Sequence, residues 1–459
     1  MGGLAMRRLL SVSLLVLLGC LAAPLPVASQ KAPAVGGVAA CNQALKLIQE
    51  GKPKDALKVL DAAKGTMDAE DEWLWWGNRG HAQRDLRQDN EALASYSKAM
   101  ELKPDCWFRL DHTLLLHEFG RWDEAVKQLE VEVEPEYQAL AGAMRTVIEG
   151  PFKARWPNAW KKLEVRSKGG RYHVVSDVGL TVEQLDAIEK EITSLDPADK
   201  SDQGRVAKLL KPTDDLVALA NLAELTRKEY IRFSGARETD FPKGKVAKLF
   251  FFNERGDYQS FASSCGVDIT ADTVGFYRPS LRYMQLFDRK TGQKYCGISE
   301  DTISTFWHEG WHQFFHTLTE QRPIWFDEGL AVFLGYGTIK DKGATIKLGE
   351  LVRVRGEFLT RYEIIKETIN KAGWTSFRRF FRLSPEGWNA GDVDVNYAQA
   401  WSIAYYGLSG NNEAFKKDYA KFFFELVKGR NPEELVPEIF TDKKLDQYEK
   451  DWLAYWKNI

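Results

Sequence analysis

The chain has 459 residues, more than one ordinary domain holds, so two or three domains are expected. Apolar residues make up 44% of the chain and aromatic residues 12%, which is enough to fill sizeable cores. Its 63 basic and 65 acidic residues nearly cancel, whereas a nucleic-acid-binding protein needs a basic surface to meet phosphates. We therefore expect no nucleic-acid partner.

Residues 1–29 are typical of an export signal peptide. Arg7 and Arg8 precede the apolar run "LLSVSLLVLLGCLAA", which is too short to span a membrane comfortably. Two processing sites compete: "LLGC" resembles a bacterial lipobox that would lipidate Cys20, and "VAS" before Gln30 suits ordinary cleavage. Both predict an exported protein, either a periplasmic or cell-envelope lipoprotein or a secreted one, with membrane contact only through a lipid at Cys20.

Residues 37–145 are expected to form an all-α solenoid of helical repeats. The stretch "WLWWGNRGHAQRDLRQDNEALASYSKAMELKPD" ends at a helix-breaking proline, Pro104, and has small residues where two helices would meet: Gly80, Ala92 and Ala99. These residues and spacings resemble the 34-residue tetratricopeptide repeat. Similar settings recur around Ala56 and Ala125, which implies about three repeats. The repeats imply either a concave surface for a peptide or protein partner, or a spacer that displays the next domain.

Residues 155–410 mix strands with helices. Strand patterns occur in "RYHVVS" and "KVAKLFFFN", and "VGFYRPSLRYMQLFD" is typical of a hairpin. Helices are expected near 180–195 and 216–233, and an apolar-rich helix should begin after Ser299 in "SEDTISTFWHEGWHQFFHTL". Because strands come first and helices follow, this part is predicted to be α+β. Residues 411–459 look helical and should pack on it as a C-terminal extension.

The cysteines leave two interpretations open. Cys265 and Cys296 flank one segment and could pair in an oxidising compartment, or both could be buried free thiols. No Cys-x-x-Cys spacing occurs, and no cysteine lies near the paired histidines, so a cysteine-type zinc site is not expected.

Two of the seven histidines lie four residues apart in "HEGWH". On an α-helix, His308 and His312 would share a face with about 5–6 Å between their Cβ atoms, so both can reach one Zn2+ ion. Glu309 lies one residue round from His308, where it cannot easily bind that ion but can reach a water beside it. The spacing predicts two metal ligands and a general base, rather than a helix with two idle imidazoles.

A catalytic zinc site needs a third protein ligand and an open position. The stretch "RPIWFDEGLAVF" offers two carboxylates, Asp327 and Glu328. Pro323 breaks the chain, so a second helix can return and place a carboxylate opposite the histidines. Small residues such as Gly329 would let this helix pack closely against the first. Spacing alone leaves both carboxylates open as the third ligand.

The combination of "HEGWH" and "PIWFDEGLA" resembles the gluzincin peptidases, in which two histidines and a glutamate hold zinc. It is nearest to the peptidase-MA-like domains of exported bacterial proteins. "DEGLA" also resembles the "NEGFA" element of the aminopeptidase N class, whose glutamate is the ligand, and this match assigns the third position to Glu328. The resemblance covers roughly residues 160–410 and implies a zincin-like, thermolysin-type fold with a helical C-terminal part.

A further match concerns Tyr397 in "NYAQAWSIAYYGL". In aminopeptidase-type gluzincins a tyrosine about this far after the glutamate stabilises the oxyanion, and the resemblance gives Tyr397 that role. The same stretch also fits a core helix with Tyr397, Trp401 and Tyr405 on one stripe. Val332 stands where the thermolysin branch has a histidine-orienting aspartate, so that group must come from elsewhere. His316 is interpreted as packing or supporting the site.

The sequence therefore predicts an exported Zn2+-dependent metallopeptidase acting on a peptide or protein. The "GAMEN" element of aminopeptidases is missing before the histidine pair, which favours an endopeptidase. One alternative is a non-catalytic or structural zinc domain in a repeat-containing binding or scaffold protein. Another is a different hydrolase, or a self-processing regulator, using the same zinc chemistry.

Overall fold

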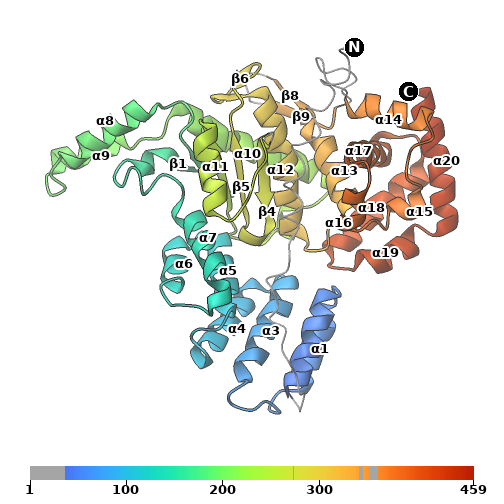
Figure 1. The fold of residues 1–459 in the computed structure, drawn as a ribbon, viewed down its shortest axis with the longest axis horizontal. Coiled ribbons are helices and arrows are strands. Elements are labelled where there is room, and N and C mark those ends of the chain that lie inside the picture. The colour runs from blue at the N-terminus through green and yellow to red at the C-terminus, as the bar shows by residue number, and fades with distance from the viewer. Residues whose placement is uncertain (1–36, 272, 341–344, 351–359) are drawn as a thin grey trace.

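The computed structural model describes residues 37–271, 273–340, 345–350 and 360–459. The predicted signal peptide (residues 1–29), with Cys20, lies outside the described residues. The chain combines helices with a small mixed sheet and begins with a helical region, which confirms the predicted mixture of helices and strands and the helical N-terminal part (Figure 1).

Packed helix pairs form the N-terminal region, in the lower part of Figure 1. Its α-helices are α1 (Gly37–Gln49), α2 (Pro53–Ala62), α3 (Glu72–Asp85), α4 (Asp89–Leu102), α5 (Phe108–Glu118), α6 (Trp122–Gln128) and α7 (Gln138–Glu149). Ala56, Ala92 and Ala125, the equivalent positions of the three predicted repeats, are all fully buried. A Cβ on Gly80 would lie 2.5 Å from the Tyr96 ring, so the pair α3/α4 needs glycine there. Helix α4 ends just before Pro104, as expected.

A five-stranded sheet has the order β1-β2-β3-β5-β4. Its strands are β1 (Glu164–Arg166), β2 (Tyr172–Ser176), β3 (Ala247–Phe252), β4 (Gly275–Arg278) and β5 (Tyr283–Phe287). The central strands β2, β3 and β5 are parallel, and the two edge strands β1 and β4 are antiparallel to their neighbours. The predicted strands and the predicted hairpin are all present, and β4 occupies an edge.

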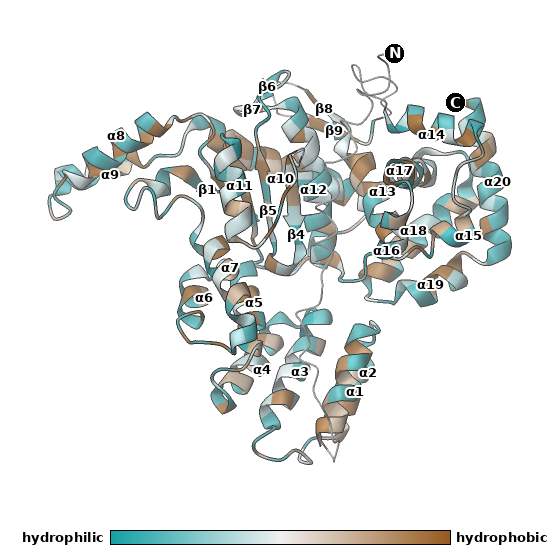
Figure 2. Ribbon diagram, in the orientation of Figure 1, coloured by the Kyte–Doolittle hydropathy of each residue, from teal (hydrophilic) through white to brown (hydrophobic). Residues whose placement is uncertain are grey.

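The sheet separates two hydrophobic cores. Because successive side chains of a strand point to opposite faces, Leu249 and Phe251 of β3 enter one core and Phe250 and Phe252 enter the other. The first core contains residues of the helices that follow the sheet, and the second contains the N-terminal helices. Figure 2 shows the apolar colouring gathered on central elements, with polar colouring on the outer helices.

The remaining elements before the C-terminal helices surround the sheet. They are α8 (Val182–Thr193), α9 (Lys200–Leu209), α10 (Asp214–Ser234), α11 (Arg255–Ser264), α12 (Glu300–Leu318), α13 (Ile324–Gly335) and the short strands β6 (Lys294–Tyr295), β7 (Ile298–Ser299), β8 (Gly337–Lys340) and β9 (Thr345–Leu348). Helices α8 and α9 project from the body (Figure 1). Short 3-10 turns are η2 (Pro135–Tyr137), η3 (Trp160–Leu163), η4 (Glu238–Asp240) and η5 (Pro279–Leu281).

The C-terminal part is helical and shares the first core. Its helices are α14 (Arg361–Asn370), α15 (Phe377–Phe380), α16 (Pro385–Ala390), α17 (Val393–Ser409), α18 (Glu413–Val427), α19 (Pro432–Ile439) and α20 (Asp442–Asn458). Buried side chains of α18, α19 and α20 belong to the same core as those of α12 and α13. Residues 411–459 therefore pack on the preceding part, as expected, and complete its core.

The four described cysteines form no disulfide bond. Cys41, Cys106, Cys265 and Cys296 are all buried free thiols, so the disulfide interpretation of Cys265 and Cys296 is not supported and the free-thiol one is. Within the described part of the chain, no helix has the length and apolar character needed to cross a membrane.

Candidate metal centre

Two consecutive helices carry the predicted ligands. Helix α12 follows Ser299, which has extended backbone at the N-cap position, and α13 begins directly after Pro323. The two helices pack against each other, so the helical return predicted from Pro323 is present. The predicted reason for Gly329 is wrong, however. A Cβ there would lie 2.5 Å from the Ala400 carbonyl oxygen, so Gly329 permits close approach of α17 rather than α12.

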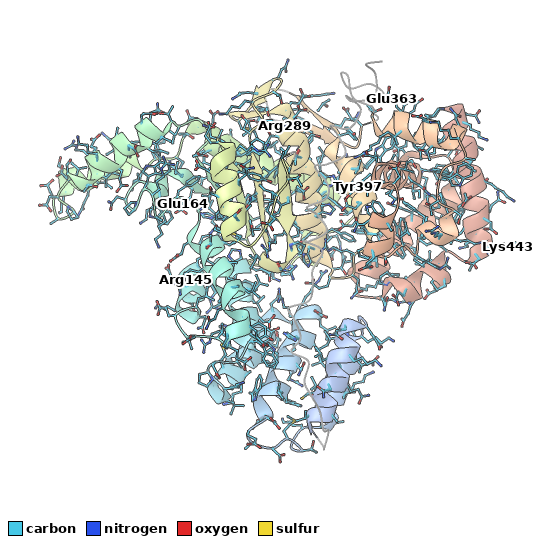
Figure 3. All side chains as sticks on the ribbon, viewed as in Figure 1. Arg145, Glu164, Arg289, Glu363, Tyr397 and Lys443 are labelled. Carbon is cyan, nitrogen blue, oxygen red and sulfur yellow. The ribbon has the colours of Figure 1, made fainter. Side chains whose placement is uncertain are left out.

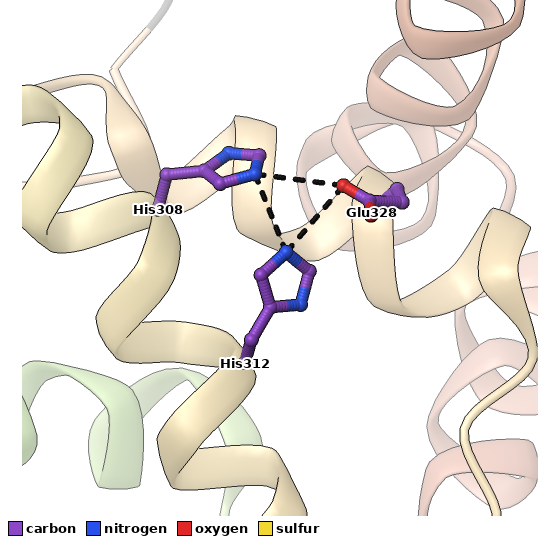
Figure 4. Close-up of side chains that lie close together, drawn as sticks. All are labelled: His308, His312 and Glu328. Atoms are coloured by element: carbon purple, nitrogen blue, oxygen red, sulfur yellow. Dashed lines mark hydrogen bonds and ion pairs between the residues drawn. The ribbon is translucent and has the colours of Figure 1, made fainter. Parts of the chain in front are cut away.

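The three predicted ligands converge. Nε2 of His308 lies 3.3 Å from Nε2 of His312, and Oε2 of Glu328 lies 3.5 Å from each of these nitrogens (Figure 4). Tetrahedral bonds of about 2.0–2.2 Å would place donor atoms roughly 3.3–3.5 Å apart. The observed triangle therefore has the size of one face of a zinc coordination tetrahedron.

The chemistry of this donor set fits a cation. His312 and Glu328 are buried, and Oε2 of Glu328 has no hydrogen-bond partner although it is removed from solvent. The two imidazoles 3.5 Å away give this buried oxygen ion-pair contacts but no hydrogen bond, and a metal ion between the three groups would satisfy it. Among the described residues, His308, His312 and Glu328 are the one group of three or more such side chains placed to hold a metal.

Asp327 lies against His312 and is not part of the triad. Its Oδ1 lies 2.9 Å from Nδ1 of His312, and Arg322 donates a 2.8 Å hydrogen bond to its other oxygen. A carboxylate at Nδ1 favours the tautomer whose Nε2 lone pair faces the ligand position. Burial lowers the pKa of His312, but the charges of Asp327 and Glu328 outweigh it and raise the pKa well above its usual value. The negative field that favours a proton there also favours a metal cation.

Glu309 lies beside the triad without joining it. Its Oε1 is 4.0 Å from Nε2 of His308, and its Oε2 accepts a 2.9 Å hydrogen bond from the backbone N–H of Tyr277 on the edge strand β4. Burial raises the pKa of the Glu309 carboxyl, with the neighbouring histidines opposing. A carboxyl group with a raised pKa, held next to the ligand position, suits proton transfer.

Tyr397 also reaches this region, from α17. Its side chain is buried between α13 and the C-terminal helices (Figure 3), with Trp388 packed edge-on at 5.1 Å and the Arg361 guanidinium 5.4 Å from the ring centre. Burial raises the pKa of Tyr397 well above its usual value, and the nearby carboxylate of Glu328 raises it further. The structure therefore brings together all five predicted site residues, although Tyr397 is also part of the core.

A family model matches part of the chain. Residues 302–423 are similar to a family described as "Protein of unknown function (DUF1570)". The matched segment runs from the first turn of α12 into α18, contains all five predicted site residues and covers less than half of the chain. No curated protein matches the chain.

One supporting residue was predicted from the sequence, and two supporting groups were missed. His316 lies against Tyr277 and Glu320 rather than with the triad, in agreement with a supporting role. The sequence offers Asp327 only as a rival ligand, although its place beside Glu328 on the same helix is a signal of its supporting role. Tyr277 contributes a backbone N–H that donates to Glu309, and a pattern of side chains in the sequence does not predict such a contact.

Proposed function

We propose that the protein is a zinc-dependent peptidase of the gluzincin type, in which His308, His312 and Glu328 hold the ion. The observation that carries this proposal is the triangle of donor atoms, with sides of 3.3, 3.5 and 3.5 Å. Three protein ligands leave one tetrahedral position open, which is typical of catalytic rather than structural zinc. When bound, a zinc ion in such a site lowers the pKa of water and polarises a substrate carbonyl.

The residues around this position supply proton transfer. Glu309 would take a proton from the attacking water and deliver it to the leaving amine. The Tyr277 N–H holds one oxygen of Glu309, which leaves Oε1 on the side of His308. The Tyr397 hydroxyl would donate to the oxyanion that forms on the substrate.

The edge strand β4 offers a place for an extended peptide. Among the described residues it pairs only with β5, so the backbone groups of Gly275 face away from the sheet, whereas the Tyr277 N–H is already bonded to Glu309. An extended peptide could pair with such an edge by strand addition. This arrangement supports a zincin-like fold with an endopeptidase site. The helical pairs of residues 37–145, proposed as tetratricopeptide-like repeats, would recruit a protein substrate or partner.

We also propose that the protein is exported. The "LLGC" and "VAS" patterns within residues 1–29 support a cell-envelope lipoprotein anchored at Cys20 or a secreted protein. Metabolic labelling with a fatty acid distinguishes the two. A lipoprotein should be labelled and should lose the label in Cys20→Ala, whereas a secreted protein should not be labelled.

The decisive experiment is a peptide-library digest combined with elemental analysis. The purified chain should contain one zinc per molecule and cleave peptides, and a chelator should abolish cleavage until zinc is restored. Glu309→Gln should keep its zinc and lose roughly 100-fold or more of the rate. Glu300→Gln, an exposed change on the same helix, is the matched control and should behave like the wild type. Zinc without cleavage in the wild type would favour the structural-zinc alternative, and absence of zinc would refute the proposal.

A further inference from the structure

Tyr277 of the edge strand β4 contacts α12 at two residues, Glu309 and His316. Its backbone N–H donates to Oε2 of Glu309 over 2.9 Å, and its hydroxyl lies 2.9 Å from Nδ1 of His316. Nε2 of His316 in turn lies 2.5 Å from the Glu320 carboxylate. Burial and the nearby Arg282 cation lower the pKa of His316 to about 3, so at neutral pH the ring is neutral and carries one hydrogen.

Arg282 links this set to the N-terminal helical region. It stands between η5 and β5 with a left-handed backbone (φ 55°), which a non-glycine residue rarely adopts. Its guanidinium contacts His316, lies 2.6 Å from Glu320, and lies 3.6 Å from Glu118 at the end of α5. One side chain therefore contacts the end of the catalytic helix and a helix of the N-terminal region.

Glu118 is held by further cations on its own side. Arg84 of α3 and Lys245, just before β3, each lie 3.6 Å from its carboxylate. Burial alone would raise the pKa of Glu118, but Lys245, Arg282 and Arg84 lower it to about 2. The Glu118 backbone carbonyl also accepts a 2.7 Å hydrogen bond from the N–H of Val246. The helical region is thus docked on the sheet by a buried ionic cluster rather than by a free linker.

The buried ionic cluster around Glu118 and Arg282 lies where it can hold strand β4 in place. This strand has four residues and, within the described part of the chain, pairs on one side only, so little of its own pairing resists displacement. A cavity of about 60 Å³ beside it is lined by Glu118, Lys245, Tyr277, Arg282 and His316, so packing there is incomplete. The ionic contacts of Arg282 therefore add to the apolar packing of Phe276 and Tyr277 on the two faces of β4.

We propose that Arg282 is a positioning residue through which the N-terminal helical region holds strand β4, and with it Glu309, in place. The helical region is then part of the working site and not only a recruiting module. The consequence for catalysis rests on the proposed function, because it takes Glu309 as the general base. The mechanical link from Glu118 to the Tyr277 N–H does not depend on that function.

The test compares amide hydrogen exchange in three variants. Glu118→Gln removes the negative charge in the N-terminal helical region and leaves β4 unchanged. Arg282→Met removes the positive charge. Arg282→Lys keeps that charge but lacks the planar guanidinium group that can contact two partners at once. The exposed pair Arg121–Glu124 lies in the same region, so Glu124→Gln is the matched control. Exchange is followed in peptides covering residues 275–282, with α20 as the internal reference.

In Glu118→Gln and Arg282→Met, the Tyr277 amide should exchange roughly tenfold faster than in the wild type. Zinc content and exchange in α20 should not change. In the active enzyme kcat should fall roughly 10- to 100-fold with KM unchanged. Arg282→Lys should lie between wild type and Arg282→Met, and it carries the test if another variant does not fold.

Wild-type exchange at Tyr277 in the folded Glu118 and Arg282 variants would overturn the inference. The outcome stays separate from that of the proposed function. If the wild type bound zinc but cleaved no peptide, the function would fail, while exchange at Tyr277 would still decide whether the helical region holds β4.

Discussion

Nδ1 of His312 lies 2.9 Å from Oδ1 of Asp327, while Nε2 of the same ring faces the triad. Asp327 and Glu328 are adjacent on α13, so one turn of one helix supplies both a proposed metal ligand and the carboxylate that lies against another proposed ligand. This arrangement places the orienting aspartate one residue before the glutamate, not at the position of Val332.

Asp327→Asn should weaken zinc binding about 10- to 100-fold, because an amide no longer fixes the imidazole tautomer as a carboxylate does. The dissociation constant is measured by competition with a coloured chelator. Asp123→Asn, an exposed change of the same type in α6, should leave zinc affinity unchanged. Equal affinity in the wild type and Asp327→Asn would show that Asp327 does not tune the site.

Tyr397→Phe separates an oxyanion donor from a core residue. If the hydroxyl donates to the oxyanion, kcat should fall about 100- to 1,000-fold with zinc content unchanged. Tyr405→Phe, on the same helix and partly exposed, is the matched control and should keep its rate. A loss of thermal stability with unaltered kcat would leave Tyr397 a packing residue only.

Gly329→Ala tests the contact between α13 and α17. The added Cβ would meet a backbone oxygen at 2.5 Å, so one helix must shift, at a cost of about 1–3 kcal/mol in the free energy of unfolding. Gly142→Ala in α7 meets nothing within 4 Å and should stabilise by about 0.5–1 kcal/mol. Urea denaturation measures both, and an unchanged midpoint for Gly329→Ala would contradict the close approach.

Lys248 predicts a pH dependence of stability. Its ammonium is buried against the Val147 and Ile148 carbonyls, and burial lowers the pKa of Lys248 to about 7. Between this value and its usual pKa, the unfolded chain holds a proton that the folded chain has lost, so stability should rise with pH across that window. Below about pH 7 the destabilising effect is complete.

The measurement is the difference in unfolding free energy between wild type and Lys248→Met, followed from about pH 7 to about pH 10. The wild type should gain stability over this range relative to the variant. Lys98→Met, which removes an exposed lysine, should run parallel to the wild type. A constant difference between wild type and Lys248→Met would show that Lys248 stays charged when folded.

The sequence by itself determined the local geometry. Four-residue spacing on a helix places His308 and His312 on one face whatever the rest of the chain does, and a proline starts the next helix. Short stretches rich in apolar residues likewise predicted the strands. Resemblance to known peptidases selected Glu328 over Asp327, a choice that spacing had left open.

Only the tertiary structure decided which distant groups meet. The Tyr277 N–H on Glu309, the packing of Gly329 on α17, and the contact of Arg282 with Glu118 join elements far apart in the chain. Such contacts depend on how whole helices and strands pack, and a backbone N–H leaves no mark in a side-chain pattern. Helical periodicity is a property of neighbouring residues, whereas the support of a site is a property of the folded whole.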